Sequence, residues 1–147
     1  MRARDLVQDF PTVHRSTPVA EAAKMLARLS LPGLVVIDDD GRPVAVLPCV
    51  EILSMAVPQY CQDDPTLARV IDEAAADVFA QQLGDRTLAQ AMPGHRWAPA
   101  TVDGDATALE VAAVMAGANS PVVAIIDGSG KVDGVITLTT LLERVLG

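Results

Sequence analysis

The chain has 147 residues, half of them apolar, a length that suits one globular domain or two very small ones. Its formal net charge of −8 argues against nucleic-acid and anionic-lipid partners, because both are bound by clustered Lys and Arg. No apolar run approaches the roughly 20 residues of a membrane span, and residues 1–10 lack the apolar region of a signal peptide. Two isolated cysteines, Cys49 and Cys61, indicate neither a disulfide scaffold nor a zinc site. We therefore expect a cytoplasmic protein with no membrane-inserted segment.

After a short first strand, the chain has the pattern of a helix. Thr17 is a good helix N-cap, and the apolar residues at 19, 22, 23 and 26 have the spacing of one buried helical stripe. Pro32 ends the helical region, because proline cannot continue a helix.

Two strands and a closing helix follow. Residues 33–37 are a continuous, β-branched run, typical of a strand covered on both faces. Turn residues at 38–43 lead to a second strand at 44–47 and then to a helix at 50–56. This segment therefore predicts the order strand, helix, strand, strand, helix.

Residues 58–85 have a different character. Asp64 and Pro65 are typical of a helix N-cap and first turn, and Gly84 of a C-terminal cap, so we expect a connector helix of about 18 residues. One face of this helix is acidic. We expect that face to be solvated, and a partner-docking face is the alternative.

The first pattern of elements returns in residues 86–147. In the helix, Thr17 matches Thr107 at an offset of 90 residues, whereas Pro32 matches Pro121 at an offset of 89. The change of offset predicts one inserted residue within the intervening helix or its C-terminal turn. The second helix is expected to have a buried stripe at 109, 112, 113 and 116. Neither copy buries enough surface alone, so the two copies should share one core.

The repeated pattern resembles the cystathionine-β-synthase (CBS) domain, which occurs as a tandem pair called a Bateman module. The segments that carry the resemblance are 17–25, 31–38, 44–53, 107–115, 120–127 and 134–142. It implies a stand-alone pair with an α+β fold, in which two β-α-β-β-α repeats pack about a pseudo-two-fold axis, with an extra connector helix. The expected parts are repeat 1 at 1–57, the connector helix at 58–85 and repeat 2 at 86–147.

The resemblance also implies a ligand site. In this family the clefts between repeats bind AMP, ADP, ATP or S-adenosylmethionine through a Gly-h-x-Thr/Ser-x-x-Asp motif at a strand-to-helix turn. The second repeat has Gly134 and Thr137 in this motif, with Thr140 in place of the ribose-binding Asp. The first repeat has Pro48 in place of the hydroxyl, which lacks even an N–H, and Glu51 in place of the Asp.

Seven residues are candidates for ligand binding. Thr137 is alternatively a β-branched residue that ends a strand and caps the next helix. Glu51 is alternatively an acidic residue favoured in the first turn of a helix. The candidates are Thr137, Thr140, Gly134, Val102, Pro121, Glu51 and His14.

No catalytic or metal-binding constellation is visible in the sequence, so we do not expect an enzyme. By the resemblance, the chain is a regulatory module that binds an adenosine-containing ligand and modulates a partner in trans, either an enzyme or a transporter. We expect a homodimer. The alternative is a degenerate pair that binds no nucleotide and acts as a dimerisation or protein-interaction scaffold.

Overall fold

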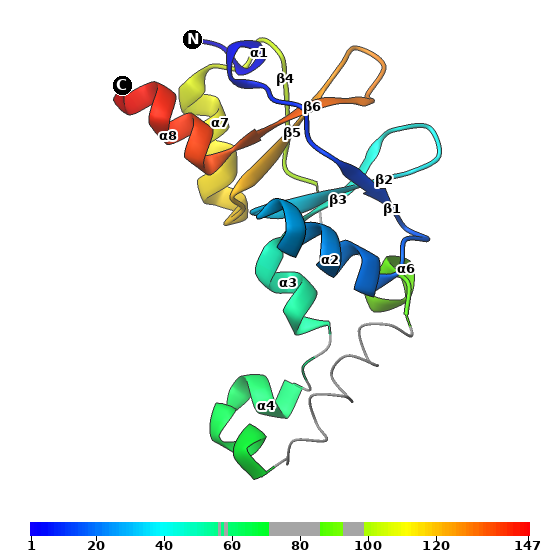
Figure 1. Ribbon diagram of the computed structural model, residues 1–147. Helices are drawn as coiled ribbons and strands as arrows, with labels where there is room; N and C mark the ends of the chain where they lie inside the picture. Colours follow the sequence, from blue (N-terminus) through cyan, green and yellow to red (C-terminus); the bar gives the residue numbers. More distant parts are fainter. Residues whose placement is uncertain (56, 58, 71–85, 93–98) are drawn as a thin grey trace.

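The computed structural model describes residues 1–55, 57, 59–70, 86–92 and 99–147 (Figure 1). It confirms an α+β fold with two repeats, each built on a three-stranded mixed sheet. The first repeat contains α1 (Ala3–Leu6), β1 (Thr12–His14), α2 (Val19–Leu29), β2 (Gly33–Ile37), β3 (Pro43–Pro48) and α3 (Cys49–Ser54). The second contains α6 (Leu88–Ala91), β4 (Thr101–Asp103), α7 (Ala108–Ala118), β5 (Val122–Ile126), β6 (Val132–Thr137) and α8 (Leu138–Leu146).

The two sheets have the same topology. The central strands, β2 and β5, each pair in parallel with the preceding short strand and antiparallel with the following strand. The first four residues of both central strands are buried, as predicted from their continuous apolar runs. Helices cover each sheet, and β5 contacts both β2 and β3, so the sheets meet at the centre of the molecule (Figure 1).

The β2–β3 and β5–β6 turns lie against each other where the two repeats meet. The amide of Val132 donates to the carbonyl of Gly41 over 2.9 Å. In each turn an aspartate accepts backbone N–H bonds from the residues that follow, namely Asp38 in the first repeat and Asp127 in the second. These bonds stabilise the turns that the sequence predicted.

One prediction about the repeat is wrong. From the first strand of each repeat onward, equivalent elements lie 89 residues apart. Examples are β1 and β4 (Thr12 to Thr101) and α3 and α8 (Cys49 to Leu138). The helices α2 and α7 have the same length, so neither repeat has an inserted residue in this helix or in the turn after it. The match of Thr17 to Thr107 at an offset of 90 is therefore not a structural equivalence.

The helix N-caps show the consequence of this shift. Thr107 caps α7, because its side chain accepts the amide of Glu110 over 3.1 Å. Its structural equivalent is Pro18, which occupies the N-cap of α2 without a side-chain hydrogen bond. The predicted cap, Thr17, instead accepts the amide of His14 in the preceding turn over 3.0 Å.

The buried stripe of α7 also differs from the prediction. In α2 the predicted stripe is correct, with Val19 and Ala22 buried. In α7 the buried residues are Val111 and Met115, whereas Leu109 is 80% exposed. A shift of one residue rotates a helical position by about 100°, which is enough to move a side chain from the core to solvent.

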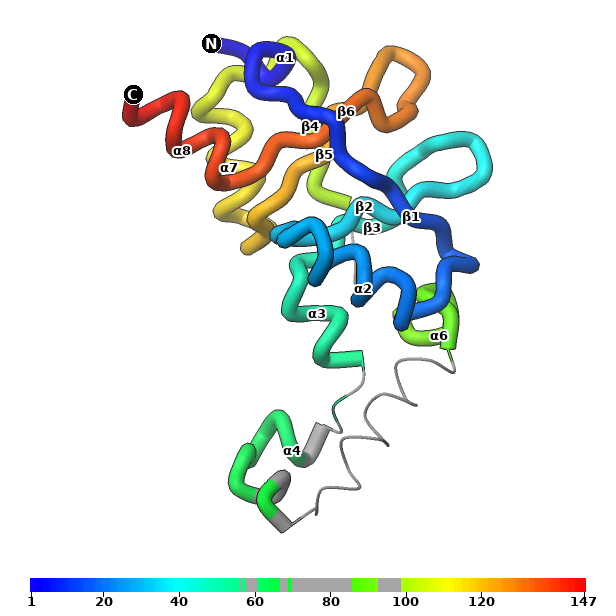
Figure 2. The backbone as a smooth tube through the Cα atoms, in the orientation of Figure 1, coloured from blue at the N-terminus to red at the C-terminus, as the bar shows by residue number. Residues whose placement is uncertain are grey.

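The two repeats exchange their N-terminal segments. Leu6 of α1 is buried in the core of the second sheet, whereas Leu88 of α6 is buried in the core of the first. The backbone bonds follow the same exchange: the amide of Ala3 donates to Ala106, and the amide of Leu88 donates to Thr17. Figure 2 shows the N-terminal segment running along the second repeat, beside α8 and the C-terminus.

Little of the predicted connector helix falls on described residues. After α4 (Gln59–Asp63), residues Pro65–Val70 form a 3-10 helix, η1. Asp64 caps the start of η1. Its Oδ1 accepts a hydrogen bond from the amide of Thr66 over 3.2 Å and another from the hydroxyl of Thr66 over 2.6 Å. Residues 71–85, with the expected C-terminal cap at Gly84, lie outside the described residues. Across the described part of the chain, no helix is both long and apolar enough to span a bilayer.

Candidate functional site

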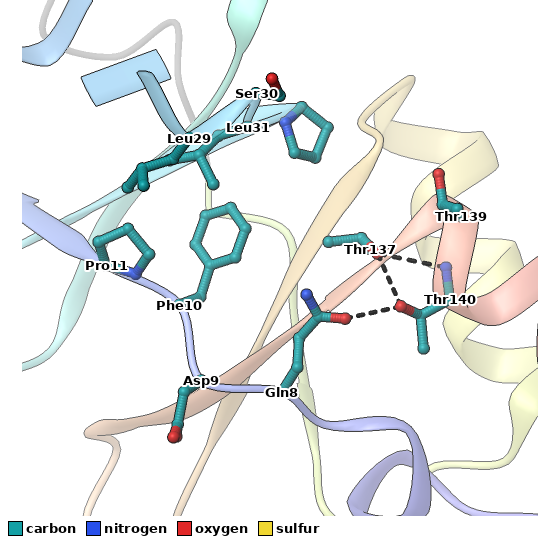
Figure 3. Close-up of a pocket in the computed structure, with 11 residues that line it drawn as sticks. Gln8, Asp9, Phe10, Pro11, Leu29, Ser30, Leu31, Thr137, Thr139 and Thr140 are labelled. Carbon is teal, nitrogen blue, oxygen red and sulfur yellow. Dashed lines mark hydrogen bonds between the residues drawn. The ribbon is translucent and has the colours of Figure 1, made fainter. Parts of the chain in front are cut away.

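A cavity of about 400 Å³ lies between the end of α2 in the first repeat and the start of α8 in the second (Figure 3). Its volume is within the range of small-molecule sites. Three segments that are far apart in the sequence line it: residues 8–11, residues 29–32 and the first turn of α8. The lining residues are Gln8, Asp9, Phe10, Pro11, Leu29, Ser30, Leu31, Pro32, Thr137, Thr139 and Thr140.

One wall of the cavity is apolar. Phe10 and Pro11 come from the segment before β1, and Leu29 and Leu31 come from the C-terminal end of α2 (Figure 3). Phe10 packs against the core of the second repeat, although it precedes the first strand of the first repeat. An aromatic ring beside leucine and proline forms a surface on which a planar ring stacks.

The opposite wall carries a chain of hydrogen bonds. The hydroxyl of Thr137 donates to Oγ1 of Thr140 over 3.0 Å, and the hydroxyl of Thr140 donates to Oε1 of Gln8 over 2.6 Å (Figure 3). Thr137 is only 6% exposed, and its Oγ1 also accepts the amide of Thr140 over 3.2 Å. Thr137 is therefore the N-cap of α8, the alternative role predicted for it.

The backbone at the start of α8 is also engaged. The amide of Leu138 donates to the carbonyl of Pro121 over 2.8 Å, and the equivalent amide of Cys49 donates to Pro32 over 2.9 Å. Two of the first three amides of α8 thus have protein acceptors. Free N–H groups at a helix start are what attracts anions, so this site offers few of them.

Only Thr137 and Thr140 of the seven predicted ligand residues line this cavity. Gly134 lies beneath Val7: a Cβ atom built on Gly134 would be 2.1 Å from Cγ2 of Val7. Val102 is buried in the core of the second repeat. Pro121 borders a separate groove between α7 and α8, of about 350 Å³, with Leu138 and Leu142.

The remaining two predicted residues belong to the first repeat. Glu51 accepts the hydroxyl of Ser54 over 3.1 Å within α3 and does not reach the cavity. His14 is exposed and ends β1, whereas the sequence placed it just after that strand. Pro48 occupies the N-cap of α3 without a side-chain bond, as its missing hydroxyl requires.

The sequence analysis did not identify Gln8, Asp9, Phe10 and Pro11, which all line the cavity. They precede the first strand in sequence and reach the second repeat only through the exchanged N-terminal segment. The backbone of Gln8 pairs with Val135 of β6 in both directions, over 3.0 and 3.3 Å. The one available signal was Phe10, because the chain has only two phenylalanines.

Charge is sparse at the cavity. Asp9 is the one charged residue among its described lining residues.

Two aspartates with lowered pKa values lie in the turns and not at the cavity. A hydrogen bond from the amide of Arg42 lowers the pKa of Asp38, and a hydrogen bond from the hydroxyl of Ser129 lowers the pKa of Asp127. Among the described residues, no cluster of His, Cys, Asp and Glu has the arrangement of a metal site.

The family model for the CBS domain matches residues 3–56 and 96–147, that is, both repeats. The chain is a tandem CBS domain pair. A CBS domain-containing protein of unknown function from Kribbella flavida DSM 17836 is 40% identical, with a TM-score of 0.82; the match covers 100% of this chain and 99% of that one. A search of curated proteins found no match.

More distant structures share the fold of this CBS pair. CBSX2 from Arabidopsis thaliana is 17% identical, with a TM-score of 0.74; the match covers 99% of this chain and 94% of that one. The CBS pair of MJ0100, in complex with 5′-methylthioadenosine and S-adenosyl-L-methionine, is 21% identical, with a TM-score of 0.66 and 100% and 96% coverage. CBSX2 has also been solved in complex with AMP; that chain is 18% identical over 99% of this chain and 96% of its own, with a TM-score of 0.69. Identities this low relate the folds alone.

Proposed function

We propose that this CBS pair is a regulatory sensor that binds an adenosine-containing ligand in the cavity between α2 and α8 and modulates a partner protein in trans. The observation that carries the proposal is the composition of the cavity. An aromatic and aliphatic wall faces a row of threonine hydroxyls across a volume of about 400 Å³. The apolar wall suits a purine ring, and the hydroxyls and the Gln8 amide suit the ribose.

Two relatives with the same fold support the choice of ligand. Their crystal structures contain AMP in one case and S-adenosylmethionine with 5′-methylthioadenosine in the other. In this chain, Thr140 and Gln8 together supply polar atoms where the family motif has an aspartate.

The position of the cavity provides a route to regulation. Its walls come from the end of α2 in one repeat and from the start of α8 in the other, so a ligand there contacts both repeats. A ligand that binds one arrangement of the repeats more tightly than another shifts the population toward it. An enzyme or transporter that recognises one arrangement would then respond to the ligand.

A thermal-shift titration with adenosine, AMP, ADP, ATP and S-adenosylmethionine tests the proposal. A ligand present at 100 times its dissociation constant stabilises the folded state by about 2.7 kcal/mol. Phe10→Ala should abolish the shift, because it removes the ring of the apolar wall. The variants Thr137→Val and Thr107→Val form a matched pair, because both remove the side chain that caps a helix. Only Thr137 lines the cavity, so Thr107→Val is the control. Absence of a shift with every ligand contradicts the proposal.

A second function, a dimerisation scaffold, is favoured by a separate surface. Helices α7 and α8 lie side by side on the second sheet (Figure 1). Both helices expose large apolar side chains. These are Leu109, Leu138, Leu142, Val145 and Leu146. Exposed apolar surface of this kind marks interaction sites, and a second copy of the chain is the partner we expect.

Sedimentation velocity tests the scaffold function. Leu142→Glu should convert a dimer to a monomer, because it places a charge in the apolar surface. The comparison is Leu53→Glu in α3, because Leu53 is the equivalent of Leu142 in the first repeat and is similarly exposed, at 52% and 47%. It should leave the dimer intact if α7 and α8 alone form the interface. A wild-type monomer at all concentrations would contradict this function.

A further inference from the structure

The chemistry of the cavity restricts the ligand further than its size does. Resting on the proposed function, we propose that the cavity selects an adenosyl ligand whose 5′ substituent is uncharged or positively charged, a thioether or a sulfonium, over adenosine phosphates. Three features of the described residues carry this inference: the engaged donors at the start of α8, the lack of a cation among the described lining residues, and the orientation of Gln8.

Several of the donors at the start of α8 that could bind a phosphate are already in use. A phosphate at the start of a helix is bound by free backbone N–H groups and by hydroxyl protons. Here the amides of Leu138 and Thr140 donate to protein acceptors, and the hydroxyl proton of Thr137 is directed to Thr140. A phosphate would have to break these bonds to use those three donors, whereas a thioether or sulfonium has no need of them.

The charge at the cavity opposes a phosphate as well. No described lining residue is Lys, Arg or His. The one charged lining residue is Asp9, whose exposed carboxylate points away from Phe10 and Thr137 (Figure 3). The chain as a whole has a formal charge of −8. Adenosine phosphates carry two or more negative charges and find no paired cation in this lining, whereas a thioether or a sulfonium needs none.

Gln8 provides a neutral donor at the cavity. Because Thr140 donates to its Oε1, the amide nitrogen of Gln8 is left to donate to a ligand, and it points toward the side of Phe10 (Figure 3). A neutral amide is a good partner for ribose hydroxyls, which are common to all adenosyl ligands. It does not compensate the charge of a phosphate.

Isothermal titration of the full chain with adenosine, 5′-methylthioadenosine, S-adenosylmethionine, AMP and ATP tests the inference. We expect the three ligands without phosphate to bind at least about tenfold more tightly than AMP, with ATP weakest, and the difference to shrink at high salt. Asp9→Lys places a cation at the edge of the cavity, so it should strengthen AMP binding and weaken S-adenosylmethionine binding, and should change adenosine binding less than either. Asp39→Lys, in the β2–β3 turn, changes the net charge equally but lies outside the cavity lining, and should change none of the affinities.

The outcomes separate this inference from the proposed function. If AMP or ATP binds as tightly as adenosine or more tightly, the selectivity is wrong, although the sensor function stands. An equal response to Asp9→Lys and Asp39→Lys also overturns it, because the effect then comes from net charge and not from the cavity. If no adenosyl ligand binds, the proposed function itself fails.

Discussion

The one-residue shift between the helices α2 and α7 has a measurable consequence. At an offset of 89 residues, Val111 is equivalent to buried Ala22, and it is fully buried itself. Val111→Ala removes two buried carbons at about 0.8 kcal/mol each, and the remaining cavity adds a further cost, so we expect about 2–3 kcal/mol of destabilisation. Leu109 is 80% exposed, so Leu109→Ala should change the free energy of unfolding by no more than about 0.5 kcal/mol.

Urea unfolding followed by circular dichroism measures both values. Leu109 also belongs to the exposed apolar surface of α7 and α8, so the experiment is repeated at two protein concentrations to separate association from folding. An offset of 90 would place Leu109 at the position of Val19, and would therefore predict the opposite order of the two costs. A larger cost for Leu109→Ala than for Val111→Ala at low concentration would refute the structural register.

Three other predictions concern the exchanged segment and the turns. Leu6 is only 1% exposed, so Leu6→Ala should lower the free energy of unfolding by about 2–5 kcal/mol. Amide hydrogen exchange should then show lost protection in β5 and β6. Loss of protection confined to β1–β3 would contradict the packing of the N-terminal segment on the second repeat. Gly134→Ala should cost about 1–3 kcal/mol in thermal or urea unfolding, and Val7→Ala should rescue it; a failure to rescue means that Val7 is not the obstacle. Asp38 and Asp127 have lowered pKa values in the folded state, so their stabilisation is present above their unfolded pKa of about 4 and is lost as pH falls through the lowered values. The Tm of the double Asn variant should therefore depend less on pH in the acid range, and an unchanged acid profile would contradict this.

Much of the fold was predictable because its signals are local. The apolar runs of β2 and β5, the proline after each helix and the turn residues around Asp38 and Asp127 each act within a few residues. Their repetition identified two copies of one unit, and the resemblance to the CBS family followed. The helix register was the exception, because α7 is apolar on nearly all faces and its buried stripe cannot be read from composition.

The candidate site was predictable only in part. The motif placed Thr137 and Thr140 at the start of α8, and both line the cavity. The capping role of Thr137 was one of two alternatives, and only its bond to the amide of Thr140 decides that it fills this role. The tight contact between Gly134 and Val7 involves residues more than a hundred positions apart, so no sequence pattern reveals it.

The sequence by itself determined the elements, their order and their duplication, because strand, helix and turn propensities act over short distances. The tertiary structure decided which halves of the chain pack together. Leu6 belongs to the first repeat in sequence but packs in the core of the second. The segment after it places Gln8 in hydrogen-bond contact with Thr140 and places Phe10 in the facing wall of the cavity. Apolar burial drives that exchange, and burial has no direction along the chain, so local patterns do not record which sheet a segment joins.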